Sequence, residues 1–255
     1  MIRVAAVGDL HVGPEVAGSY RERLSALPDQ ADVLLVAGDL TRHGTVEEGR
    51  VAAAELRDAG VPVIAVLGNH DYHSNAENEI TAVLRDAGIT VLEGEGTVVD
   101  CGGVRLGVAG GKGFGGGFLG RCASDFGEPE MKAFVRHTKD LADRLGTALL
   151  GLDCDVRVSL THYSPSEDTL AGEPPEIYPF LGCYQLAEAI DCAEVDLAVH
   201  GHAHKGTEKG VTPGGVRVRN VALPVIQHAY AVYCLGERPD AEAECPPSAE
   251  HAAVS

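Results

Sequence analysis

The stretch that decides the fold stands at the start of the chain, where residues 2–11 read IRVAAVGDLH. A short run that is apolar on both faces is typical of a parallel strand buried between two layers. Similar runs return at residues 33–37 and 63–67, and each of the three leads into a polar loop. Helices are predicted after the three runs, at residues 16–26, 46–59 and 75–87. Strands that alternate with helices imply a parallel sheet with helices packed against it.

The predicted starts of the second and third helices carry capping signals. Thr45 with Glu48, and Ser74 with Glu77, have the spacing of a capping box, in which the first side chain and the third helical residue bond each other's backbone.

After residue 88 the pattern changes to shorter segments separated by Gly and Asp. This change predicts antiparallel strands at residues 89–92, 97–100 and 104–109. A long helix is expected at residues 129–149, with Pro129 at its first position. The remaining predicted strands lie at residues 156–160, 196–199, 216–221 and 230–235.

The length of 255 residues suits one large α/β domain with a substantial core. We assign this domain to residues 1–236. Residues 237–255 are acidic, contain three prolines and have little apolar content, so we predict a disordered tail.

The net charge of −18 excludes some partners. It argues against a face that binds long nucleic acid by counterion release, although two divalent ions would add about four positive charges locally. No apolar run has the length of a membrane span, so no membrane partner is expected. The first strand leads straight into Asp9, so a cleavable targeting peptide is not expected either.

The seven cysteines are scattered along the chain, their number is odd, and no C-x-x-C motif occurs. These features predict a reduced, cytoplasmic protein in which most cysteines are small core residues.

Polar side chains follow each of the first three strands. Asp9 stands in GDLH, Asp39 in GD and Asn69 in GNHD, and they are spaced thirty residues apart, one β-α unit each. Each therefore falls at the carboxyl end of a neighbouring parallel strand, where open α/β sheets build their sites.

Histidines follow two later strands, as His162 in THY and as His202 and His204 in HGHAH. Carboxylate, amide oxygen and imidazole are ligands for divalent ions such as Mn, Fe or Zn. Two such ions, roughly 3.5–4 Å apart, can clamp both sides of a phosphoryl displacement. The absence of cysteine from this set argues against a structural zinc site.

The ordered series D-x-H, G-D, G-N-H-D, a single H and G-H-x-H resembles the signature of the calcineurin-like metallophosphoesterases. It spans residues 8–204. The resemblance implies a four-layer α/β fold, with two mixed sheets packed face to face and helices outside. Residues 110–120 and 172–179 also resemble a bacterial branch of the family of largely unassigned phosphoesterases, and the second segment is expected to form an ordered loop near His162.

The resemblance also assigns ligands to two metal ions. They are Asp9, His11 and His204 for the first ion, Asn69, His162 and His202 for the second, and Asp39 as the bridge.

His70 is assigned a catalytic role rather than a ligand role by the same resemblance. It would contact the phosphate and stabilise the transition state or protonate the leaving oxygen, oriented by Asp71 or a nearby carboxylate. In an extended loop, the side chains of Asn69 and His70 would point in different directions. The resemblance further implies a nucleophilic hydroxide that bridges the two metals.

Several other residues near these motifs leave alternatives open. Arg42 and His43 could face the substrate or be ordinary surface residues. His200 is expected to pack or to support the ligands. Four further histidines are predicted to be core or surface residues without a role in the site: His73, His137, His228 and His251.

The glycine-rich residues 110–120 contain a G-x-G-x-x-G match, but they do not open a helix, and Lys112 is not followed by Ser or Thr as in a P-loop. They are either a flexible connector or a mobile loop that offers Lys112 to a phosphate.

The function predicted from these features is metal-dependent hydrolysis of a small phosphate ester. A phosphodiesterase acting on cyclic nucleotides or similar molecules and a phosphomonoesterase both remain open. A DNA nuclease is disfavoured by the acidic charge and the lack of a capping domain. The rival from another class is a non-catalytic scaffold, which ranks lower because every ligand position and His70 are present. The sequence leaves the substrate, the metals and the oligomeric state open.

Overall fold

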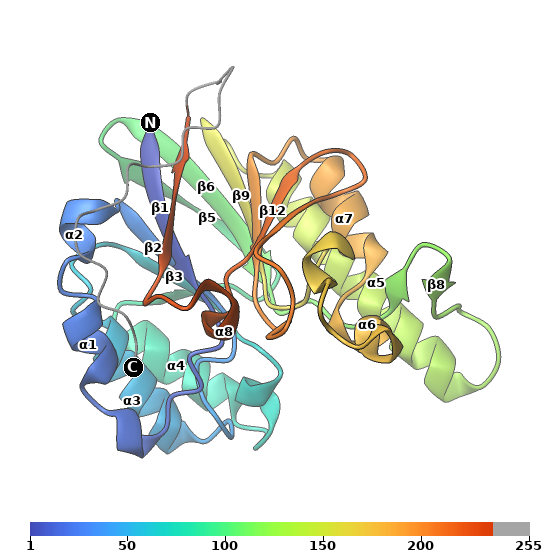
Figure 1. The fold of residues 1–255 in the computed structure, drawn as a ribbon, viewed down its shortest axis with the longest axis horizontal. Helices are drawn as coiled ribbons and strands as arrows, with labels where there is room; N and C mark the ends of the chain where they lie inside the picture. The colour runs from blue at the N-terminus through green and yellow to red at the C-terminus, as the bar shows by residue number, and fades with distance from the viewer. Residues whose placement is uncertain (237–255) are drawn as a thin grey trace.

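The computed structural model describes residues 1–236, which form two large sheets with helices on their outer faces and one small two-stranded sheet (Figure 1). The predicted disordered tail lies outside the described residues.

The first sheet contains the three strands predicted from the start of the chain. Its order is β13-β1-β2-β3-β4, with neighbours parallel except for the antiparallel pair β13 and β1. The strands are β1 (Ile2–Val7), β2 (Val33–Ala37), β3 (Val63–Val66), β4 (Thr90–Val91) and β13 (Ala231–Leu235). The prediction of an antiparallel strand at residues 89–92 is wrong, because a helical crossover returns the chain to the same edge and β4 pairs parallel to β3.

The helices of the first half agree with the sequence in part. α3 (Val46–Leu56) begins with the predicted capping box of Thr45 and Glu48. α4 (Glu77–Asp86) begins after Ala76 instead of Ser74, whose hydroxyl donates to the carbonyl oxygen of His43 at 2.7 Å. The second predicted capping box is therefore wrong.

The single helix predicted at residues 16–26 is divided into three short pieces. They are η1 (Pro14–Val16), α1 (Ser19–Arg23) and α2 (Leu27–Gln30). Gly18 has a left-handed φ of 90°, which separates η1 from α1. A left-handed residue cannot continue a right-handed helix.

The second sheet has six strands in the order β11-β12-β10-β9-β6-β5. β5 and β6 form an antiparallel pair as predicted, and the neighbours from β6 to β12 are parallel. The strands are β5 (Glu95–Cys101), β6 (Val104–Gly111), β9 (Val156–Thr161), β10 (Leu197–His200), β11 (Lys209–Val211) and β12 (Arg217–Asn220).

The two sheets pack face to face around one apolar core. On β10, Leu197 and Val199 belong to this core, whereas Ala198 between them faces a second core under α5 (Pro129–Leu150) and α7 (Tyr184–Asp191). Helices α3 and α4 lie on the opposite side of the molecule from α5 and α7 (Figure 1). The predicted four-layer fold with two mixed sheets is confirmed.

Short elements connect the layers around one end of the sheets. They are η2 (His70–Tyr72), β7 (Gly117–Phe118), β8 (Arg121–Cys122), η3 (Asp168–Leu170), η4 (Pro175–Ile177), α6 (Tyr178–Leu181) and α8 (Leu223–Ile226).

The glycine-rich segment is packed rather than a free connector. The amide of Gly116 donates to the carbonyl oxygen of Pro179 at 2.7 Å, and the amide of Gly117 donates to that of Gly182 at 2.9 Å. A Cβ added at Gly115 would lie 2.6 Å from the Pro179 oxygen. The glycines thus allow two backbones to touch.

The prediction that most cysteines are small core residues is wrong within residues 1–236. Of the five free thiols in this part of the chain, only Cys183 is buried. The helices of residues 1–236 include none with the length and apolar character that a membrane span requires. The cytoplasmic location stays a prediction.

Candidate metal centre

All eight residues predicted for the site meet where the carboxyl ends of strands from both sheets come together. Asp9 and Asp39 follow β1 and β2 in the first sheet, and Asn69 and His70 follow β3. The histidines His162, His202 and His204 follow β9 and β10 in the second sheet.

One group of ligand-type atoms is formed by Asp9, His11 and His204, which lie within 4.8 Å of one another. Nε2 of His204 is 2.9 Å from Oδ1 of Asp9. The Asp9 carboxylate, which is 2% exposed, also accepts from the backbone amide of His202. One carboxylate and two imidazoles therefore converge from two sheets.

A second group is formed by Asp39, His162 and His202, again within 4.8 Å. Oδ1 of Asn69 lies 2.9 Å from Nε2 of His162. Nδ1 of His162 donates to the carbonyl oxygen of Ala37, so Nε2 keeps its lone pair on the side of the cluster. Nε2 of His202 donates to the carbonyl oxygen of Phe180, which leaves its Nδ1 for a cation.

Asp39 belongs to the second group and also faces the first. Its Oδ2 is 3.7 Å from Nε2 of His11, and its Oδ1 is 3.4 Å from Nε2 of His162. One carboxylate thus has an oxygen directed toward each group.

Glycines of the motifs make room for these ligands. A Cβ added at Gly38 would lie 2.6 Å from Nδ1 of His162. One added at Gly68 would collide with the Asp39 carboxylate, and one at Gly201 with that of Asp9. Close approach of a ligand-type side chain from another strand therefore requires the glycines before Asp39, Asn69 and His202, whereas a Cβ at Gly8 would meet Ala37.

The backbone at the site is in an unusual conformation. Asp9, His11, Asp39 and His202 have φ values of 58°, 44°, 50° and 70°, which lie in the left-handed region. For residues other than glycine this costs about 1 kcal/mol or more each, and such residues cluster at functional sites.

Burial favours the neutral form of most of these imidazoles. It lowers the pKa of His11 to about 4 and that of His202 to about 3, whereas the hydrogen bond to Asp9 raises the pKa of His204. Burial also raises the pKa of Asp39 to about 9, with repulsion from Asp9 and Asp71 adding to the effect. Neutral imidazoles around crowded carboxylates are a donor set that a divalent cation would complete.

His70 also reaches this centre. Its Nδ1 donates to the carbonyl oxygen of Arg42 at 2.8 Å, and its Nε2 lies 3.9 Å from Oδ2 of Asp39. Asn69 and His70 form a helical turn rather than the predicted extended loop. Their side chains nevertheless diverge, with Asn69 toward His162 and His70 toward His11. His70, His11 and Asp39 have ligand atoms within 4.8 Å, so position alone permits a ligand role for His70 as well.

Asp71, one of the two alternatives that the sequence left open for orienting His70, does not contact its ring. Its buried carboxylate accepts from the amides of Leu40, Thr41 and Gly68 and from the hydroxyl of Thr41. It therefore joins the loop after β2 to the loop after β3. The backbone carbonyl of Arg42 orients His70 instead.

Replacing Asp71 with alanine should lower the free energy of unfolding by about 3 kcal/mol or more. Three buried amides would lose their acceptor, and each unpaired group costs about 1–3 kcal/mol. Urea unfolding followed by circular dichroism measures this loss. The exposed Asp153→Ala serves as the control, and a loss below about 1 kcal/mol for Asp71→Ala would contradict this role.

The residues near the centre whose roles the sequence left open contact other side chains of the same protein. Arg42 forms an ion pair with Glu15, and Nδ1 of His43 lies 2.8 Å from Oε1 of Glu48. His200 is buried and bonds the hydroxyl of Thr169 at 2.8 Å, which fits the expected packing role.

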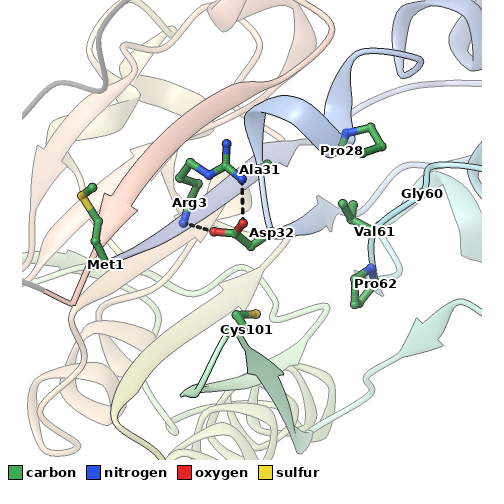
Figure 2. A pocket seen from close by; sticks show the side chains of 10 residues that line it. Met1, Arg3, Pro28, Ala31, Asp32, Gly60, Val61, Pro62 and Cys101 are labelled. Atoms are coloured by element: carbon green, nitrogen blue, oxygen red, sulfur yellow. Dashed lines mark hydrogen bonds and ion pairs between the residues drawn. The ribbon is translucent and has the colours of Figure 1, made fainter.

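A separate pocket of about 530 Å³ lies at the opposite ends of the strands, near the start of β1 and before β2 and β3 (Figure 2). Its carboxylate, Asp32, accepts from the backbone amide and the guanidinium of Arg3. None of its lining residues is a histidine. The pocket therefore lacks the chemistry of the centre described above.

The two mixed sheets gather carboxylates and imidazoles at one edge, and this donor set suits divalent metal ions. The chain belongs to the calcineurin-like phosphoesterase family, whose model matches residues 2–206. Membership supports a metal-dependent phosphoesterase in general.

Solved structures share the fold at low sequence identity. Phosphopantetheinyl hydrolase (PptH) from Mycobacterium tuberculosis has 17% identity and a TM-score of 0.61, covering 87% of this chain and 89% of its own. GAP50, the anchor in the inner membrane complex of Plasmodium, has 13% identity and a TM-score of 0.51, covering 88% and 72%. No curated protein sequence matches the chain.

Proposed function

We propose that the protein hydrolyses small phosphate esters with two divalent metal ions. The observation that carries this proposal is the position of Asp39, which belongs to one group of ligand-type side chains and also faces the other. The first ion would be held by Asp9, His11 and His204, the second by Asn69, His162 and His202, and both by Asp39.

A bound pair of divalent ions would supply Lewis-acid activation of water and of the phosphate oxygens. The chain itself supplies the rest of the chemistry. His70 is held by Arg42 with its Nε2 facing the centre. When both of its ring nitrogens carry a hydrogen, His70 donates a proton or hydrogen bond from Nε2 to the phosphate or the leaving oxygen.

Phosphate monoesters and phosphate diesters both remain candidate substrates. Mn, Fe and Zn all suit the donor set of oxygen and imidazole nitrogen.

Metal removal tests the proposal. The protein should contain divalent metal after purification, and chelation should abolish hydrolysis of nitrophenyl phosphate or of bis-nitrophenyl phosphate. Readdition of Mn, Fe or Zn should restore it, with metal content measured by elemental analysis. Full activity in the chelated, metal-free protein would overturn the proposal.

A non-catalytic scaffold is the second candidate, since GAP50 shares the fold and is described as an anchor. The complete set of ligand-type side chains favours the enzyme. Bound metal without hydrolysis of any phosphate monoester, diester or cyclic nucleotide would favour the scaffold.

A further inference from the structure

Lys112 lies beside the metal centre although it is far from the ligands in sequence. It directly follows β6, which pairs parallel to β9, the strand that leads into His162. The carbonyl oxygen of Lys112 accepts from the amides of His162 and Tyr163 at 3.1 and 3.0 Å. Its backbone is thus fixed to that of a ligand-type residue.

The ammonium of Lys112 is enclosed by aromatic rings. Nζ lies 5.0 Å from the ring centre of Tyr72, 4.8 Å from that of Phe114 and 5.3 Å from that of Tyr163. These distances are in the range of cation–π attraction. The ring of Tyr163 also lies 4.4 Å from that of His202, so the enclosure borders the second group of ligands.

Burial lowers the pKa of Lys112, and the negative charges of Glu93 and Asp39 offset this effect only in part. Lys112 is only 9% exposed, and Nζ has one hydrogen-bond acceptor among the described residues, the carbonyl oxygen of Gly113 at 3.4 Å. An ammonium can donate three hydrogen bonds, and a buried charge without a close partner is costly.

The position of the Lys112 ammonium is poorly explained by a purely structural role as the counter-ion of Glu93. The carboxylate of Glu93 accepts from the hydroxyl of Tyr72 at 2.8 Å, and the ring of that tyrosine faces Nζ. Among the described residues, no ion pair joins Lys112 and Glu93. Burial is the main influence on the pKa of Asp39 and of His162, but the charge of Lys112 also acts on both. Its field therefore reaches the place where substrate would bind.

Building on the function proposed above, we propose that Lys112 is a substrate-binding residue that attracts the phosphate anion and favours dianionic monoesters over monoanionic diesters. The aromatic rings hold the ammonium in place without neutralising it, so its charge remains available to an anion. Coulomb energy scales with the charge of the partner, so a dianion gains about twice the free energy that a monoanion gains.

The test replaces Lys112 with methionine or with glutamine, which both remove the charge. Methionine suits the site because its thioether packs well against aromatic rings. In the metal-loaded protein at about pH 8, the affinity for inorganic phosphate should fall about tenfold, as for the loss of one hydrogen bond to a charged group. The kcat/KM should fall about tenfold for nitrophenyl phosphate but only about threefold for bis-nitrophenyl phosphate.

Metal content and melting temperature separate this role from a structural one. Both variants should keep their metals, because a positive charge is removed from the neighbourhood of cations rather than added. Lys139→Met, on the exposed side of α5, is the matched control and should change none of these values. An unchanged phosphate affinity in either variant, or equal losses for both esters, would overturn the proposal.

A failure of the Lys112 proposal can be distinguished from a failure of the proposed hydrolase function. If the wild type hydrolyses neither ester, the proposed function fails, whereas calorimetric titration with inorganic phosphate still decides whether Lys112 binds the anion.

Discussion

Replacing Asp39 with alanine should remove bound metal and hydrolytic activity together. Asp39 has one carboxylate oxygen directed toward each group of ligands, 3.7 Å from Nε2 of His11 and 3.4 Å from Nε2 of His162. Without it neither ion would keep its full set of ligands, and turnover should fall by about 10³ or more, to below detection. Elemental analysis and nitrophenyl ester hydrolysis on the same preparation measure both effects.

Asp32→Ala provides the matched control for this variant. Asp32 precedes the same strand, β2, at its opposite end and pairs with Arg3. Its loss should leave metal content and turnover near those of the wild type. Two metals per chain and normal turnover in Asp39→Ala would contradict the bridging role.

Replacing His70 with asparagine should lower kcat by roughly 10²–10⁴ while both metals stay bound, since general acid help of this kind contributes that much to the rate. The loss should shrink for nitrophenyl esters, which have a good leaving group, if His70 protonates the leaving oxygen. It should persist for them if His70 stabilises charge on the phosphate. Kinetics on a good and a poor leaving group, with metal analysis, distinguish the two roles.

His73→Asn is the control, because its ring lies 4.3 Å from that of His70 on the same turn. This variant should keep most of the activity. Loss of one metal from His70→Asn would instead make His70 a ligand, which its 3.9 Å distance from Asp39 also permits.

The parts of the structure that depend on local pattern could be predicted from the sequence. The apolar composition of the three runs predicts β1, β2 and β3, and the polar residue after each run falls at the carboxyl end of its strand. Since the carboxyl ends of parallel strands share one edge, the convergence of Asp9 and Asp39 follows without knowledge of the rest of the fold.

Features that depend on distant contacts could not be predicted in the same way. The partner of β4 is decided by where α4 returns the chain, not by the residues of β4 themselves. Asp71 adjoins His70 in sequence, but its carboxylate is used by amides from another loop. Two of the aromatic rings around Lys112, those of Tyr72 and Tyr163, come from distant segments, so no spacing in the sequence indicates them.

The division of the ligands between the two sheets has a consequence for the lifetime of the protein. Asp9 and His204 are separated by 195 residues, so an ion held by both would act as a cross-link that closes almost the whole domain into a loop. A ligand that binds only the folded state also stabilises it by mass action. The sheets could separate only after the ions had left, which would slow unfolding and cleavage by proteases. Scarcity of divalent metal would then reduce the amount of protein as well as its activity, and abundance would preserve both.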